Sequence, residues 1–94
     1  MSEKKIGQAG TVESNDVLVT VTLNGESTGI EITLNSPVER QFGGQIKRVI
    51  NETLAAARIT DALVHVIDRG ALDFAICARV EAAIARAQGG ENDA

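Results

Sequence analysis

Aromatic residues are nearly absent from this chain of 94 residues, which contains two Phe and no Tyr or Trp. The core must therefore be built from Val, Ile, Leu and Ala, and there is no platform of rings on which nucleic-acid bases could stack. The net charge is −4, and no basic cluster appears along the chain. Because nucleic-acid binding depends on neutralising phosphates, both absences argue against a nucleic-acid partner.

Cysteine and long apolar runs are also scarce. The single Cys77 can form no internal disulfide, and no apolar run approaches the length that crosses a bilayer. Residues 1–5 carry charge with no apolar segment behind them, unlike a secretory signal. These features predict a cytoplasmic protein with no membrane partner. The length and the hydrophobic fraction of 44% predict one globular domain, residues 1–94, with flexible ends at residues 1–5 and 88–94.

Alternation of apolar and polar residues predicts four strands. Residues 17–23 alternate most regularly, and a weaker strand over residues 6–12 precedes them. Residues 30–34 repeat the pattern after a loop, and we expect them to pair antiparallel with residues 17–23. Residues 61–68 are apolar on both faces apart from His65, which is typical of a strand inside a sheet.

Two helices complete the predicted fold. Ser36 as N-cap, Pro37 at the first helical position and Glu39 as the capping-box acid predict a helix that runs to about Arg58. A second helix is predicted from about residue 72 or 73 to Ala87. Their apolar faces are predicted to be Val38, Phe42, Ile46, Val49, Ile50 and Leu54 in the first, and Phe74, Cys77, Val80, Ile84 and Ala87 in the second. The sequence thus predicts an α+β fold of order β-β-β-α-β-α, a small, mostly antiparallel four-stranded sheet with two helices packed on it.

Few residues suggest independent catalysis. His65 and Cys77 are the only base and nucleophile of their kind, and a free Cys on an apolar helix face is usually a small core residue. The carboxyl groups of Asp61, Asp68 and Asp73 fall at strand and helix ends, where caps and solvated loops explain them. No metal site is predicted from these ligands.

A polar turn separates the first two predicted strands. Residues 13–16 read Glu-Ser-Asn-Asp, and Asn and Asp favour turns because they bond to their own backbone and tolerate left-handed dihedrals. Ser14 is expected at the tip, with its hydroxyl exposed. On local sequence alone, the default interpretation of Ser14 is a solvated turn residue.

Three separated blocks change that interpretation. They are residues 9–16 (AGTVESND), residues 36–43 (SPVERQFG), and residues 68–73 (DRGALD) followed by residues 78–83 (ARVEAA). In order and spacing they resemble the γ subunit of citrate lyase, the acyl carrier protein of that complex, over roughly residues 5 to 87. Relatives often have Cys where this chain has Phe74, a difference that we interpret as a core substitution.

The resemblance implies a carrier rather than an enzyme. It implies that Ser14 carries a phosphodiester-linked 2′-(5″-phosphoribosyl)-3′-dephospho-coenzyme A, whose thiol holds acetyl and citryl groups as thioesters. The implied partners are the α subunit, an acyl transferase, and the β subunit, a citryl lyase, which together convert citrate to acetate and oxaloacetate. A prosthetic-group transferase and an acetate ligase are implied as further partners.

Two other interpretations remain open at this point. The carrier subunit of malonate decarboxylase has a similar Ser-small-Asp turn and the same type of arm, but the later blocks fit it less well. The chain could also be an interaction module that never carries a cofactor. An ordinary fatty-acid carrier would need Asp-Ser-Leu at a helix start in a four-helix bundle, and neither feature is present.

Overall fold

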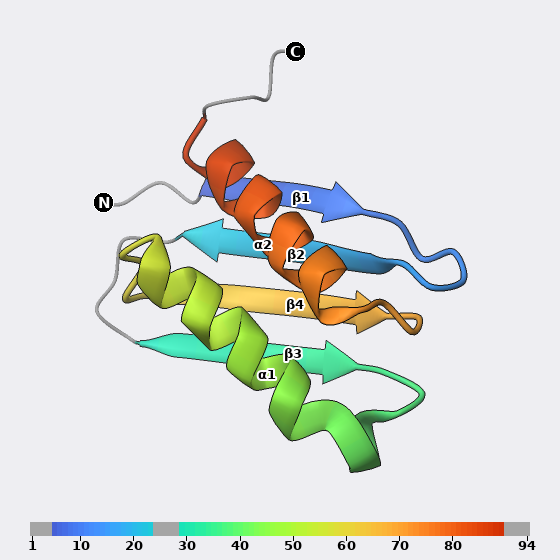
Figure 1. Ribbon diagram of the computed structural model, residues 1–94. Helices are drawn as coiled ribbons and strands as arrows, with labels where there is room; N and C mark the ends of the chain where they lie inside the picture. The colour runs from blue at the N-terminus through green and yellow to red at the C-terminus, as the bar shows by residue number, and fades with distance from the viewer. Residues whose placement is uncertain (1–4, 24–28, 90–94) are drawn as a thin grey trace.

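A computed structural model describes residues 5–23 and 29–89, and it contains the predicted elements in the predicted order (Figure 1). The elements are β1 (Lys5–Gly10), β2 (Val17–Leu23), β3 (Ile30–Asn35), α1 (Glu39–Ala56), β4 (Ala62–Asp68) and α2 (Asp73–Ala87). The predicted α+β class is therefore confirmed. The ends at residues 1–5 and 88–94 were predicted to be flexible, and most of each, residues 1–4 and 90–94, lies outside the described residues.

The sheet is mixed, with the strand order β1-β2-β4-β3. β2 pairs antiparallel with both β1 and β4, whereas β3 pairs parallel with β4. The predicted antiparallel pairing of residues 17–23 with residues 30–34 is wrong, because β4 lies between these strands. The helix α1 connects β3 to β4, and such a crossover connection is what joins neighbouring parallel strands. The predicted internal position of β4 is confirmed.

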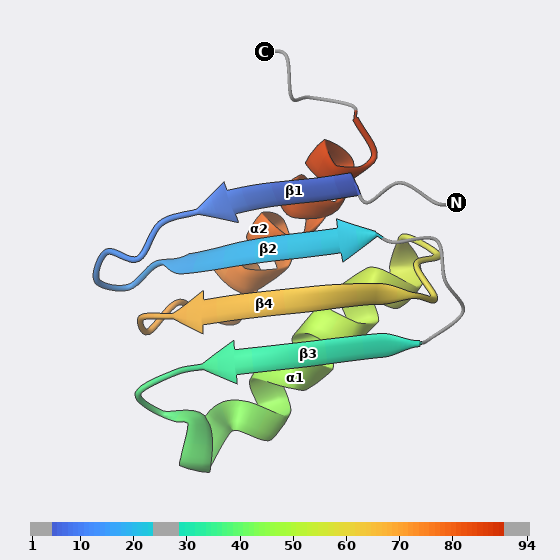
Figure 2. The same ribbon diagram turned by 180° about the vertical axis from the view of Figure 1, so that it is seen from behind.

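Both helices cover the same face of the sheet, and the other face is left open (Figures 1 and 2). Alternate residues of β2 and β4 point toward the helices and are buried, while Leu63 and His65 lie on the open face and are exposed. The helices contribute the rest of the core. The most deeply buried large side chains are Val17, Val19, Val21, Ile50, Leu54, Val64, Val66, Ile76 and Val80.

The start of α1 differs from the capping box that the sequence predicts. The N-cap is Val38, and it makes no side-chain cap hydrogen bond. The Ser36 hydroxyl instead donates to Asp68 Oδ2 at 2.8 Å and accepts from the Val38 N–H at 3.2 Å. The hydroxyl thus links the segment before α1 to a buried acceptor in β4. The helix ends at Ala56 rather than Arg58, because Arg58 has a left-handed backbone with φ of 62°.

The predicted extent of α2 is confirmed at its start and at Ala87, but Phe74 is not in the core. Its side chain is 73% exposed, so the interpretation of Phe74 as a core substitution is wrong. The buried residues of α2 begin with Ile76 and recur at intervals of three and four. A residue two positions before Ile76 lies about 200° away around the helix, on the solvent side.

Gly7 lets α2 approach the sheet closely. A Cβ at this position would collide with the backbone of α2 at the Ala83 carbonyl oxygen and the Ala87 nitrogen. In the sequence, Gly7 only weakens the predicted strand. In the fold, the absence of a side chain at Gly7 allows α2 to pack against β1. Within the described residues, neither helix is long and apolar enough to span a membrane.

Candidate functional site

The Ser14 turn connects β1 to β2 at the same end of the sheet as the β4–α2 loop (Figure 1). The Asp16 N–H donates to the Glu13 carbonyl oxygen at 3.1 Å, and Asn15 has a left-handed backbone with φ of 66°. Asn adopts this conformation more readily than most residues do. Ser14 is exposed, and no described residue forms a hydrogen bond with its hydroxyl. The hydroxyl can therefore be reached from outside.

Backbone hydrogen bonds tie this turn to the β4–α2 loop. The Asn15 N–H donates to the Arg69 carbonyl oxygen at 2.8 Å, and the Arg69 N–H donates to the Asp16 carbonyl oxygen at 2.9 Å. These two bonds continue the antiparallel pairing of β2 with β4 beyond the ends of both strands. Gly70 follows with a φ of 97°, and a Cβ there would lie 3.5 Å from Asn15 Oδ1. The turn and the loop therefore form one connected surface.

Asp16 holds the turn from inside. Its carboxyl accepts hydrogen bonds from the Thr11 hydroxyl at 2.6 Å and from the Val17 N–H at 2.7 Å. It also pairs with Arg79, whose Nη2 lies 3.2 Å from Asp16 Oδ2. The Thr11 hydroxyl, the Val17 N–H and the Arg79 guanidinium lower the pKa of the Asp16 carboxyl to about 2. These contacts show that Asp16 shapes the loop.

Arg79 is a site residue that the sequence did not single out. It reaches the turn from α2, 63 positions along the chain from Asp16. Its presence in the third block of the resemblance, residues 78–83, was the only available signal.

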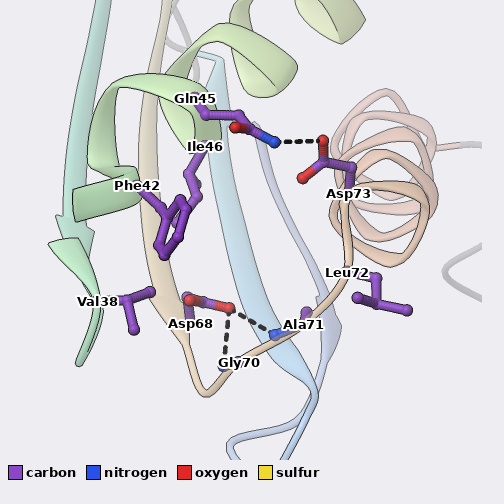
Figure 3. A pocket seen from close by; sticks show the side chains of 9 residues that line it. All are labelled: Val38, Phe42, Gln45, Ile46, Asp68, Gly70, Ala71, Leu72 and Asp73. Atoms are coloured by element: carbon purple, nitrogen blue, oxygen red, sulfur yellow. Dashed lines mark hydrogen bonds between the residues drawn. The ribbon is translucent and has the colours of Figure 1, made fainter.

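Asp68 lies at the end of β4, as predicted, and it accepts hydrogen bonds from the following loop, but it is buried and not in a solvated loop. Its side chain is only 1% exposed. Asp68 Oδ1 accepts from the Gly70 N–H at 3.1 Å and from the Ala71 N–H at 2.9 Å, as the dashed lines in Figure 3 show, while Oδ2 accepts from Ser36. The inward positions of β4 are its alternate residues, and Asp68 is the last of them. Alternation could therefore have predicted its burial.

A groove of about 460 Å³ lies between the first turns of α1 and residues 68–73 (Figure 3). Val38, Phe42 and Ile46 line one side of it, and Asp68 and the loop line the other. Gln45 Nε2 donates to Asp73 Oδ2 at 2.9 Å and so links the two helices across it. We call this space the interhelical groove. Its lining is apolar but includes two carboxyl groups.

A second groove of about 390 Å³ lies beside the Ser14 turn and is lined by Asn15, Gly70, Leu72, Phe74 and Ala75. We call it the turn groove. It shares Gly70 and Leu72 with the interhelical groove, so the two spaces flank one segment of the loop. Leu72 is 64% exposed and Phe74 is 73% exposed, which makes the rim of the turn groove apolar.

The other candidate residues do not come together. His65 lies on the open face of the sheet, whereas Cys77 lies on the helix-covered side, where the Thr53 hydroxyl is 3.5 Å from its Sγ. Asp61 accepts from the Gly29 N–H at 2.7 Å in the β3–β4 region. Within residues 5–23 and 29–89, no group of three His, Cys, Asp or Glu residues could hold a metal ion. The arrangement around Ser14 presents an exposed hydroxyl, and no described carboxyl forms a hydrogen bond with it. The Asp16 carboxyl is a poor proton acceptor, because its pKa is about 2.

Comparison with known proteins gives three findings. The family described as "ACP: Malonate decarboxylase delta subunit (MdcD)" matches residues 4–87. Proteins named "Citrate lyase acyl carrier protein" from Streptococcus pyogenes serotype M5 (strain Manfredo) and serotype M49 (strain NZ131) are each 47% identical over 89 residues, covering 95% of this chain and 86% of the relative. A crystal structure of a Pseudomonas malonate decarboxylase hetero-tetramer in complex with malonate contains a chain similar in fold, with a TM-score of 0.61, 17% identity, and coverage of 100% of this chain and 97% of that chain.

Proposed function

Since this chain belongs to the acyl carrier protein family, we propose that it is the acyl carrier subunit of a citrate lyase complex and that Ser14 is its attachment site. The family match over residues 4–87 and the identity of 47% to named carriers confirm the family that the three sequence blocks resembled. The observation that supports Ser14 is the exposure of its hydroxyl on a turn that other segments hold in place.

The proposed prosthetic group is 2′-(5″-phosphoribosyl)-3′-dephospho-coenzyme A, linked to Ser14 through a phosphodiester. When bound, it would supply a terminal thiol that carries acyl groups as thioesters. The residues present fit this group, because the hydroxyl is primary, exposed and free of hydrogen bonds to described residues. Thioester chemistry suits citrate cleavage, since an acetate fragment leaves more readily as the enolate of a thioester than beside a free carboxylate.

The rigid turn and a flexible arm would have separate tasks. The proposed partners are the α subunit, an acyl transferase, and the β subunit, a citryl lyase, and one thiol must reach both active sites. A tethered group has a high effective concentration at each site that its arm can reach. The fold itself would supply only the attachment point of the arm, so the chain is proposed to be non-catalytic.

Attachment of the arm requires a partner that activates the hydroxyl. Glu13 adjoins Ser14 in the chain, but among the described residues its carboxyl forms no hydrogen bond with the Ser14 hydroxyl. The Asp16 carboxyl, two positions away, is already occupied by Thr11, Val17 and Arg79, and its low pKa makes it a weak base. We therefore propose that a prosthetic-group transferase supplies the base. An acetate ligase that charges the thiol is a further proposed partner, and the cytoplasm is the proposed location.

Intact mass measurement of the protein from its own host tests the proposal. We expect a discrete adduct that maps to Ser14, and we expect Ser14→Ala to remove both the adduct and citrate cleavage by the reconstituted complex. Because Ser14 is exposed, the free energy of unfolding should change by no more than about 0.5 kcal/mol. Thr33→Ala, an exposed hydroxyl residue of β3, is the matched control and should keep both.

The same measurement separates the other candidates. Retention of the adduct and of citrate cleavage in the Ser14→Ala protein would overturn the assignment of Ser14. Absence of any adduct would favour the interaction module. The structural neighbour and the family description favour a malonate decarboxylase carrier as the second candidate. An adducted protein that supports malonate decarboxylation but not citrate cleavage would establish it.

A further inference from the structure

The aromatic ring of Phe74 is mostly exposed to solvent beside the Ser14 turn. Phe74 is one of only two Phe residues in the chain and is 73% exposed, although Phe side chains gain substantially from burial. The neighbouring Leu72 is 64% exposed. Single exposed apolar residues are common, but two that border the same groove form a surface that suits an apolar or aromatic ligand.

The turn groove has the correct position for a group attached to Ser14. Asn15 follows Ser14 in the chain and lines this groove together with Phe74. The hydrogen bond from the Asn15 N–H to the Arg69 carbonyl oxygen fixes the turn against the loop. A group bonded to the Ser14 oxygen therefore starts one residue away in the chain from the lining of the groove, on a turn that is fixed against the loop.

The two grooves differ in charge. All five residues that line the turn groove are uncharged, whereas the interhelical groove includes the carboxyl groups of Asp68 and Asp73. A neutral flat group suits the former, and a phosphate would be repelled by acidic groups in the latter.

We propose that Phe74 is a stacking platform for the adenine of the arm anchored at Ser14, with the base lying in the turn groove. This inference rests on the proposed function, since it requires an arm that contains adenosine. Only a phosphate and ribose units separate the Ser14 oxygen from the base, which makes adenine the first flat, neutral aromatic group along the arm. Aromatic side chains can stack on any nucleic-acid base, because every base has a flat π-face.

Docking of the base would fix the direction in which the remainder of the arm leaves the carrier. Only the segment of the arm between the docked base and the thiol would then move freely. Less conformational entropy would therefore be lost when a partner binds the arm. Phe74 would then act as a positioning residue for the arm, with no part in the chemistry.

Proton NMR of the loaded carrier tests the proposal directly. The chain has two Phe, one His and no Tyr or Trp, so the adenine H2 and H8 signals should appear in a sparse aromatic region. We expect nuclear Overhauser contacts between these protons and the Phe74 ring, together with an upfield shift relative to the free nucleotide. In Phe74→Leu, the ratio of docked to undocked base should fall by about fivefold or more.

Matched variants make each outcome decisive. Intact mass must first show the adduct in every variant, and its absence from the wild-type protein would refute the proposed function together with this inference. Phe42→Leu, in the interhelical groove, should leave the adenine signals unchanged, and Phe74→Trp should preserve the contacts. If the adduct is present, two results would overturn the stacking: adenine signals that are unchanged in Phe74→Leu, whether or not a partner subunit binds this variant more weakly, or adenine signals that change in Phe42→Leu instead.

Discussion

Replacement of Asp68 by Ala should destabilise the protein by about 3 kcal/mol. Asp68 is buried at the end of β4 and accepts hydrogen bonds from the Ser36 hydroxyl and from the Gly70 and Ala71 N–H groups. Alanine would leave all three donors without their acceptor. A buried donor that loses its partner costs about 1–3 kcal/mol. The interhelical groove lets water approach the loop, so the lower end of that range applies to each donor.

A loss of that size is readily measured. For a domain of this length, about 3 kcal/mol corresponds to a decrease of about 12–24 °C in the melting temperature. Asp68→Asn should cost only about 1 kcal/mol, because the amide oxygen can still accept from both backbone N–H groups and the Ser36 hydroxyl can rotate to accept from the amide nitrogen. The difference in unfolding free energy between Asp68→Asn and Asp68→Ala therefore measures the contribution of the oxygen that accepts from the Gly70 and Ala71 N–H groups.

Urea denaturation of the Ser14→Ala background, which cannot carry an arm, is the assay. Asp73→Ala is the control, since Asp73 is exposed and accepts one side-chain hydrogen bond among the described residues, from Gln45, so its cost should stay within about 0.5 kcal/mol. Hydrogen exchange at the Asn15 amide should accelerate in Asp68→Ala, because that amide donates to Arg69 in the loop. A cost below about 1 kcal/mol for Asp68→Ala, or equal costs for Asn and Ala, would refute the reasoning.

Three further changes test other parts of the fold. Gly7→Ala should destabilise the protein by about 1–3 kcal/mol, measured by thermal unfolding, because the new Cβ would collide with the backbone of α2. Gly44→Ala should stabilise by about 0.5–1 kcal/mol, because a Cβ there meets open space and Ala favours the helix. The pKa of Asp16 is lowered from 3.8 to about 2, so its contribution to stability should be complete above about pH 4 and should disappear as the pH falls toward 2. Acid titration of Asp16→Asn should lack this component, and an unchanged titration would contradict it.

Element boundaries were largely predictable because their signals are local. The alternation in residues 17–23 identifies a strand and its buried face, and the spacing of apolar residues identifies both helices and most of their buried faces, although Phe42 and Phe74 are exposed. The order of strands in the sheet is not a local property. Nothing in residues 30–34 says whether they pair with β2 or with β4, and the crossover through α1 decides this.

The site divides in the same way. Turn chemistry predicted that the Ser14 hydroxyl is exposed, and the structure confirms this exposure, whereas only the resemblance selected Ser14 as a site. Arg79 was missed because its contact with Asp16 spans 63 positions. Phe74 was placed in the core because the helical spacing was started two residues too early, before Ile76, which begins the buried series.

A carrier gains from a fixed anchor only if the anchor resists deformation when a partner pulls on the arm. The Ser14 turn is held by Arg69 through the backbone, by Arg79 through Asp16, and less directly by Asp68 through the loop. These ties come from β4, α2 and the segment between them, all distant in sequence from the turn. Because hydrogen bonds from separate elements must break before the turn can open, its opening should cost more than the loss of any single one of them. If Ser14 carries the proposed arm, the flexibility needed to reach two active sites would then reside in the arm and not in the turn.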